Sequence, residues 1–193
     1  MKTSEKTHCQ KRKTKLLLKL TQFIALFLMG IELGVSYSHL MQLPGKSRLS
    51  VAMFIAVQTV LIQYKIGLGI VEIGSFLAIL IVLWLIRPKT LTFGLTLSAL
   101  LMLIAAFLIW VIFIEPINTV VDTWTANSYP DNWTSYRDRW HLFHVLRLIL
   151  LTIGTSSLIG SVLFPVSYPQ PTQKISSRSN TISSPWLEDT SSD

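Results

Sequence analysis

The chain has 193 residues, of which 50% are hydrophobic and 14% carry a charge, and its mean hydropathy is +0.50. Soluble domains contain about a quarter charged residues, so this composition argues against a water-soluble domain and indicates a single-domain membrane protein. The net charge is +7, and residues 2–19 hold seven of the 17 Lys and Arg residues. Because this basic segment adjoins an apolar run and has no interleaved aromatic residues, it predicts contact with anionic lipid and argues against a nucleic-acid partner.

Four apolar stretches are long enough to cross a bilayer, which takes about 20 residues. After a basic tail over residues 1–15, the predicted spans cover about residues 16–37, 66–86, 91–114 and 141–164. The first span is too long for a cleaved signal peptide and no clean small-residue site follows it, so we expect it to be retained. A further apolar stretch, about residues 49–63, is too short to cross and predicts an interfacial helix, with a fifth span as the alternative. The sequence therefore predicts an all-α, integral membrane four-helix bundle.

Two other features bear on the boundaries and packing of the bundle. Residues 165–193 are rich in Ser, Thr and Pro, which predicts a disordered tail. Small residues let helices approach closely, and they occur as Gly30-x-x-x-Gly34 in span one and around Gly154 in span four. We expect both groups to pack inside the bundle rather than at a dimer interface, and the oligomeric state stays open.

The distribution of Lys and Arg predicts the orientation. With the N-terminus inside, the inner side holds eleven of these residues and the outer side six. The excess of positive charge inside predicts that both termini are cytoplasmic, in the plasma membrane or an internal membrane. The short segment Arg87-Pro88-Lys89 predicts a tight hairpin between spans two and three.

Ionisable side chains gather at one depth of the predicted bundle. With a rise of about 1.5 Å per residue, Glu32, Glu72, His144 and Arg147 lie roughly 6–10 Å below the outer ends of three different spans. His39 lies at the outer rim. Charged residues within spans face the bundle interior and pair with one another, and they are by default a functional-site hypothesis. The alternative is a purely structural network of ion pairs.

The residue types in this layer suit two kinds of chemistry. His141, His144 and Arg147 are three residues apart and share a helix face, as do Glu32 and His39. Histidine can act as a general base, and arginine can hold an oxyanion. Glutamate and histidine are also ligands for transition metals, although His-x-x-His is a weak signature. Cys9 is the only cysteine, which excludes a Cys-x-x-Cys redox motif. The metal-ligand candidates are His141, His144, Glu32 and Glu72.

The predicted outer loop over residues 115–140 is rich in aromatic residues. Its members are Trp124, Tyr129, Trp133, Tyr136 and Trp140. Such residues usually mark the interface between membrane and water, which explains most of them. A ligand pocket is the second interpretation. The residues that we predict to contact a small apolar aromatic or lipid-like ligand are Trp124, Trp140, His39 and Glu72.

A set of motifs follows in order along most of the chain. The segment Glu115-Pro116-Ile117-Asn118 closes span three, a Trp-bearing loop follows, and Trp140-x-x-x-His144-x-x-Arg147 opens span four. Together with Gly30-Ile31-Glu32 in span one, this pattern resembles the anthrone oxygenase-like family of small four-span membrane proteins. The resemblance covers about residues 20–165. It does not include the basic head or the Ser/Thr/Pro-rich tail, and it assigns no role to His141 or Glu72.

The resemblance implies an activity and a set of catalytic residues. Characterised fungal members oxidise anthrones to anthraquinones with molecular oxygen and are regarded as needing no added cofactor. By this resemblance His144 would be the base, Arg147 the oxyanion partner and Asn118 an orienting donor, and Glu32 would complete the site. A bound transition metal remains a second possibility on the residues alone.

Three functions are compatible with these observations. The first is a membrane oxygenase of small, flat, apolar aromatic molecules. The second is a non-enzymatic protein that binds a lipid or pigment, or assists an assembly, with a structural polar layer. The third is a small transporter, which the sequence disfavours because the ionisable groups gather on one side instead of at mid-membrane.

Overall fold

Long apolar runs form helices inside a bilayer, because the helix is the structure in which a single segment satisfies its own backbone hydrogen bonds. The computed structural model describes residues 2–61, 65–86, 88 and 90–164, and no named strand occurs among them. The elements are α1 (Lys2–Lys46), α2 (Val51–Leu61), α3 (Lys65–Leu85), α4 (Leu91–Ile109), the π-helix η2 (Trp110–Ile114), α5 (Glu115–Val121) and α6 (Trp133–Leu163).

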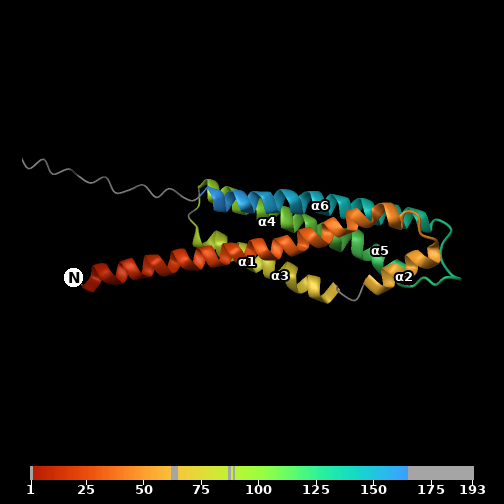
Figure 1. Cartoon of the computed structure of the whole chain (residues 1–193), viewed down its shortest axis with the longest axis horizontal. Helices are drawn as coiled ribbons and strands as arrows, with labels where there is room; N and C mark the ends of the chain where they lie inside the picture. The colour runs from red at the N-terminus through yellow and green to blue at the C-terminus, as the bar shows by residue number, and fades with distance from the viewer. Residues whose placement is uncertain (1, 62–64, 87, 89, 165–193) are drawn as a thin grey trace, which may run out of the picture.

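Four helical segments in the described residues are long and apolar enough to cross a membrane. They cover Arg12–Lys46, Gly67–Leu85, Leu91–Val121 and Trp133–Leu163. They pack as a bundle (Figure 1). In the chain, the short helix α2 comes between the first and the second of them. The predicted fold class is therefore confirmed, and the chain is a multi-pass membrane protein.

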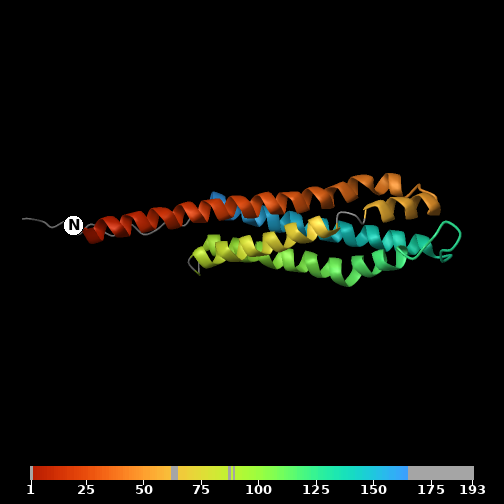
Figure 2. The ribbon, with the colours of Figure 1, turned by 90° about the horizontal axis from the view of Figure 1, so that it is seen from below.

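The four long helices run along one axis, so the bundle has two distinct ends (Figures 1 and 2). The start of α1, the end of α3, the start of α4 and the end of α6 lie toward one end, which we term the hairpin end. The α1–α2 turn and the loop over residues 122–132 lie at the other, which we term the loop end. The first and last described residues thus lie toward the same end, as the predicted topology requires. Which end faces the cytoplasm stays a prediction.

The helices extend beyond the apolar segments from which the spans were predicted. Helix α1 has 45 residues, which at about 1.5 Å per residue is longer than the roughly 30 Å hydrocarbon core. Helix α6 begins at Trp133, eight residues before the predicted span. The long loop expected over residues 115–140 is therefore limited to residues 122–132.

The third long helix changes its hydrogen-bond pattern just before Pro116 and then continues. Pro116 has no N–H to donate, so the regular ladder cannot pass through it unchanged. The Glu115 N–H donates to the Trp110 carbonyl, five residues back, and forms the π-helical turn η2. Pro116 then lies in the first turn of α5, where a missing N–H costs little. Such bulges often occur at functional sites.

The core toward the hairpin end is apolar and contains residues of all four long helices. Its fully buried members include Ala25, Met29, Ile79, Leu103 and Leu151. Helices α4 and α6 pack most extensively, and Gly154 makes this possible because a Cβ there would lie 3.1 Å from the Met102 Cβ. Gly30 and Gly34 differ, since a Cβ at either position meets nothing within 4 Å. The expectation that they pack tightly inside the bundle is therefore wrong, because both are exposed, beside a groove that Leu148 and Thr152 of α6 also line.

A second apolar cluster closes the loop end. It joins Phe54 and Ile55 of α2 to Ile117 and Val121 of α5. Trp124 and Trp140 belong to the same cluster. Helix α2 is held there by buried side chains, and the site described below lies between the two clusters.

Candidate functional site

An ion-pair cluster joins three helices between the two apolar clusters. Arg147 of α6 donates from Nη2 to both carboxylate oxygens of Glu72 of α3, at 3.1 Å each. The same nitrogen lies 3.6 Å from Oε2 of Glu32 of α1. All three side chains are buried. The convergence that the sequence predicted from depth alone is therefore present in the structure.

Glu32 is also held by a hydroxyl group. Ser75 donates from Oγ to Glu32 Oε1 at 2.9 Å, and its Oγ also lies 3.0 Å from the Val71 carbonyl oxygen. Ser75 lies three residues after Glu72, so both side chains project from the same face of α3. One face of α3 thus contacts Glu32 through Ser75 and Arg147 through Glu72.

Three rings in mutual contact lie on the loop-end side of the ion pairs. The His144 ring is 4.1 Å from the Trp140 ring and 4.2 Å from the His39 ring, measured between centroids. Trp140 and His144 are four residues apart and share a face of α6. The Nδ1 atoms of both histidines are buried with no hydrogen-bond partner among the described residues. Ring packing, rather than a hydrogen bond to Nδ1, therefore sets the orientation of His144.

Trp140 is fixed on its other side by the segment after the π-helix. Its indole Nε1 donates to Asn118 Oδ1 at 2.8 Å, and Asn118 Nδ2 donates to Glu115 Oε2 at 3.0 Å. The motif residues of α5 and α6 are therefore linked through one indole. Lys46, at the end of α1, lies over the same indole with Nζ 4.7 Å from the ring centroid, a cation–π geometry.

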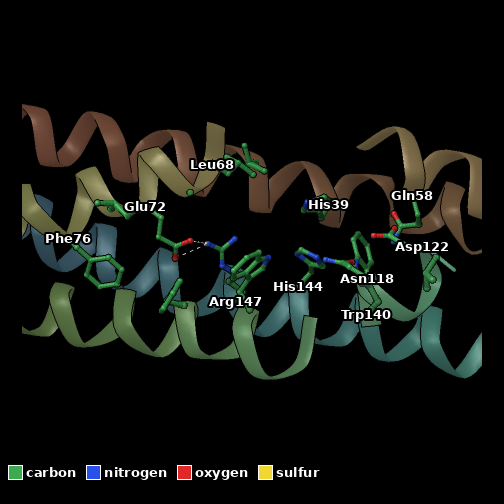
Figure 3. A pocket seen from close by; sticks show the side chains of 16 residues that line it. His39, Gln58, Leu68, Glu72, Phe76, Asn118, Asp122, Trp140, His144 and Arg147 are labelled. Carbon is green, nitrogen blue, oxygen red and sulfur yellow. Dashed lines mark hydrogen bonds and ion pairs between the residues drawn. The ribbon is translucent and has the colours of Figure 1, made fainter. Parts of the chain in front are cut away.

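Several of these side chains line a cavity of about 310 Å³. Figure 3 shows Glu72 and Arg147 paired in the middle, His39, His144 and Trp140 toward one end, and Phe76 toward the other. Phe76, Phe107 and Trp110 give an apolar aromatic wall, and the polar groups come from the remaining helices. The cavity therefore combines an aromatic surface with an imidazole, a guanidinium, an amide and an indole.

The structure brings six of the predicted site residues to this cavity. They are His39, Glu72, Asn118, Trp140, His144 and Arg147. Glu32 does not line the cavity, but its Oε2 lies 3.6 Å from Nη2 of Arg147. Trp124 lies outside the lining and packs edge-on against Tyr136, with ring centroids 5.3 Å apart. His141 also lies outside the lining, and its ring contacts the Trp140 ring edge to face, with centroids 5.3 Å apart.

The four metal-ligand candidates do not form a cluster of three or more ligands. No group of three or more His, Cys, Asp or Glu side chains that could hold a metal ion occurs in the part of the chain that the structure describes. Glu72 is engaged with Arg147, and His141 does not line the cavity. The described residues therefore show ring contacts and ion pairs at the positions where the sequence left a metal open.

The cavity also contains residues that the sequence analysis did not predict. Gln58 is buried and is the residue of α2 that reaches the cavity, and Asp122 lies at the same end. Trp110 contributes to the aromatic wall from the π-helix. The sequence holds a signal for two of these residues. Gln58 is a polar residue in an apolar stretch, and Asp122 follows Asn118 by four residues on one helix face.

Comparison of the chain with protein-family models, curated proteins and solved structures finds no match.

Proposed function

We propose that this membrane protein is an oxygenase of small, flat, apolar aromatic molecules, similar to the anthrone oxygenases, and that the cavity beside His144 and Arg147 is its active site. The observation that supports this function most is the composition of that one cavity. A base, a cation and an aromatic wall lie together inside a membrane-spanning bundle. The resemblance described for the sequence assigns roles to the same residues.

The size and the walls of the cavity suit such a ligand. Ligand pockets usually measure about 300–1,000 Å³, so a volume of about 310 Å³ favours a small molecule. Phe76, Phe107 and Trp110 offer aromatic surfaces against which a flat ring system can stack. A molecule of this kind partitions into the bilayer, where the protein resides.

The reaction begins with the removal of a proton. His144 takes a proton from the methylene carbon of an anthrone, and the electrons left behind spread onto the carbonyl oxygen. Arg147 stabilises this oxyanion through a hydrogen bond. Its Nη1 is the donor we assign, because Nη2 is engaged with Glu72 and Nε is fully buried.

Molecular oxygen then accepts the electrons. The methylene carbon forms a bond to oxygen, and the proton on His144 completes a hydroperoxide. Removal of the second methylene proton and cleavage of the O–O bond release water and leave a second carbonyl. Oxygen accepts four electrons in all, and one of its atoms enters the quinone while the other leaves as water.

The remaining residues position these two groups. Asn118 accepts a hydrogen bond from Trp140 at Oδ1 and donates one to Glu115 from Nδ2. We therefore assign Asn118 to holding the indole rather than to binding the substrate. Trp140 and His39 in turn hold the His144 ring. Glu72 and Glu32 fix the Arg147 side chain from two helices.

A second candidate function is binding without chemistry. Glu72 and Glu32 neutralise Arg147, and such a cluster is also what a structural network between three helices requires. In that case the cavity would hold a lipid or pigment unchanged.

Oxygen uptake separates the two functions. The purified protein in lipid vesicles is mixed with anthrone, and the oxygen concentration and the quinone absorbance are followed together. We expect one oxygen molecule consumed for each quinone formed, at a rate well above that of empty vesicles. Saturable binding of anthrone without oxygen uptake would contradict the oxygenase and support the binding protein.

A further inference from the structure

The two sides of the cavity differ in how far they are exposed. On one side, His39, His144 and Arg147 are each 7% exposed. On the other side, Ile73 of α3 lines the cavity and is 63% exposed on the outer surface of the bundle. Trp110, across from it, is partly exposed. A side chain that belongs both to a cavity wall and to the outer surface marks an opening, so the cavity opens between α3 and the α4–η2 segment.

Helices α3 and α4 are loosely joined at this level. The polar contacts of α3 lead to α1, through Ser75, and to α6, through Glu72. Within the described ranges no hydrogen bond or ion pair joins α3 to α4, and their packing is less extensive than that of α4 with α6. Figure 2 shows the two ribbons spreading apart with distance from their connection. An edge-to-face contact between Phe76 and Phe107, with centroids 5.9 Å apart, bounds the opening toward the hairpin end.

A glycine keeps this opening wide. Gly69, Glu72, Ile73 and Phe76 all line the cavity and follow each other at i, i+3, i+4 and i+7, one face of α3. A Cβ added at Gly69 meets nothing within 4 Å. No tight packing therefore explains a glycine at this position, whereas a larger side chain there would occupy the opening.

Among the described residues at the loop end, α2 covers most of the cavity, and the exposed lining residue there is the charged Asp122. Phe54 of α2 is fully buried against the cluster that contains Ile117 and Val121 of α5. Gln58, one turn further along α2, is buried and covers that end of the cavity. An apolar molecule that approaches at the loop end therefore meets a charged side chain, whereas one that approaches between α3 and the α4–η2 segment meets apolar side chains.

We propose that ligands reach the cavity sideways from the lipid, through an opening between α3 and α4 that Gly69, Ile73 and Trp110 border. The residues around the opening are apolar, and the opening lies within segments that span the membrane. It therefore admits uncharged aromatic molecules dissolved in the bilayer and excludes charged molecules dissolved in water. The access route rests on the proposed function only in that the cavity must bind such a molecule.

The test measures how fast a probe enters. The full chain in lipid vesicles is mixed with anthrone under nitrogen, so that binding occurs without oxidation. The saturable quenching of tryptophan emission is followed in a stopped-flow instrument, since Trp110 and Trp140 both line the cavity. Gly69→Leu narrows the opening. Gly67→Leu is the matched control, because Gly67 is exposed, has equal space and lies outside the cavity.

We expect Gly69→Leu to slow association and dissociation together by roughly tenfold, because the side chain must move aside before the ligand passes. The equilibrium constant should change far less than the rates. Gly67→Leu should behave as the wild type. Ile73→Trp offers a second variant of the opening, with Ile70→Trp as its control, since Ile70 is 68% exposed and outside the cavity.

The outcomes distinguish the access route from the function. Unchanged rates in both Gly69→Leu and Ile73→Trp would overturn the lateral opening and leave the proposed function standing. Slowing in the control variants by the same factor would overturn it as well. If the wild type shows no saturable quenching at all, both the opening and the proposed function fail.

Discussion

Arg147 places one nitrogen, Nη2, against both carboxylate oxygens of Glu72, 3.1 Å from each. The same nitrogen faces Glu32 at 3.6 Å. One guanidinium thus serves two buried carboxyl groups from two other helices. The three residues therefore do not contribute equally. Removing the cation leaves two buried acids without a counter-charge, whereas removing either acid leaves one ion pair.

This asymmetry predicts an order of stabilities. Arg147→Met should destabilise the bundle by about 3–5 kcal/mol, because it leaves buried carboxyl groups without a counter-charge. Glu32→Gln should change the stability by less than about 1 kcal/mol, because Ser75 can still donate to the amide oxygen and the Glu72 pair is kept. Unfolding midpoints in one detergent measure both. Equal destabilisation by the two substitutions would contradict the shared role of Arg147.

The indole of Trp140 links α6 to the segment after the π-helix. Trp140→Phe keeps an aromatic ring but removes the donor to Asn118 Oδ1. We expect a loss of about 1–3 kcal/mol in unfolding free energy, because a partly buried acceptor loses its partner. Trp124→Phe is the control, since Trp124 packs edge-on against Tyr136 by its ring. A larger loss for Trp124→Phe would show that ring volume, and not the hydrogen bond, matters.

The glycines of α1 and α6 should respond in opposite ways to the same change. Gly154→Ala brings a Cβ within 3.1 Å of the Met102 Cβ and 3.4 Å of the Ala99 carbonyl oxygen, so α4 and α6 must separate. Overpacking of this kind costs about 1–3 kcal/mol. Gly34→Ala meets nothing within 4 Å and should be neutral or slightly stabilising, because alanine favours helix. Thermal unfolding of the two variants side by side tests this difference, which would vanish if α1 packed through Gly34.

Elemental analysis can measure directly whether the protein binds a transition metal. The candidates His141, His144, Glu32 and Glu72 do not form a three-ligand cluster in the described part of the chain. We therefore expect the purified wild type and a His144→Ala variant to contain equally little transition metal by elemental analysis. Near-stoichiometric metal that is lost in His144→Ala would contradict this arrangement of the His144 ring and make the cavity a metal centre.

The depth of the charged residues was predictable from the sequence because helical rise and the apolar boundaries fix it. Glu32, Glu72 and Arg147 meet because each lies a similar number of residues from the same end of its span. Trp140 was also predictable, since it shares a helix face with His144, four residues later. The fold class followed from span length and composition in the same way.

Other parts of the site depend on packing that no local pattern encodes. Gln58 reaches the cavity because α2 docks on α5, and Lys46 covers Trp140 because α1 continues past its apolar segment. The helical continuation through Pro116 requires a change of register at Trp110, and together with the early start of α6 it limits the expected loop to residues 122–132. Trp124 and Trp140 look alike in the sequence, and only the direction of the chain after α5 separates them.

The central claim is that His144 acts as a base in this cavity, and one comparison of variants tests it most directly. Oxygen uptake with anthrone is measured for the wild type, His144→Gln and Thr155→Val, all in the same vesicles. Thr155 is buried in α6 two turns beyond Arg147 and outside the cavity, so Thr155→Val controls for disturbance of the helix. We expect His144→Gln to lose about 10²–10⁴-fold in rate, the usual contribution of a general base, with Thr155→Val close to the wild type. Full activity in a folded His144→Gln protein would contradict the account.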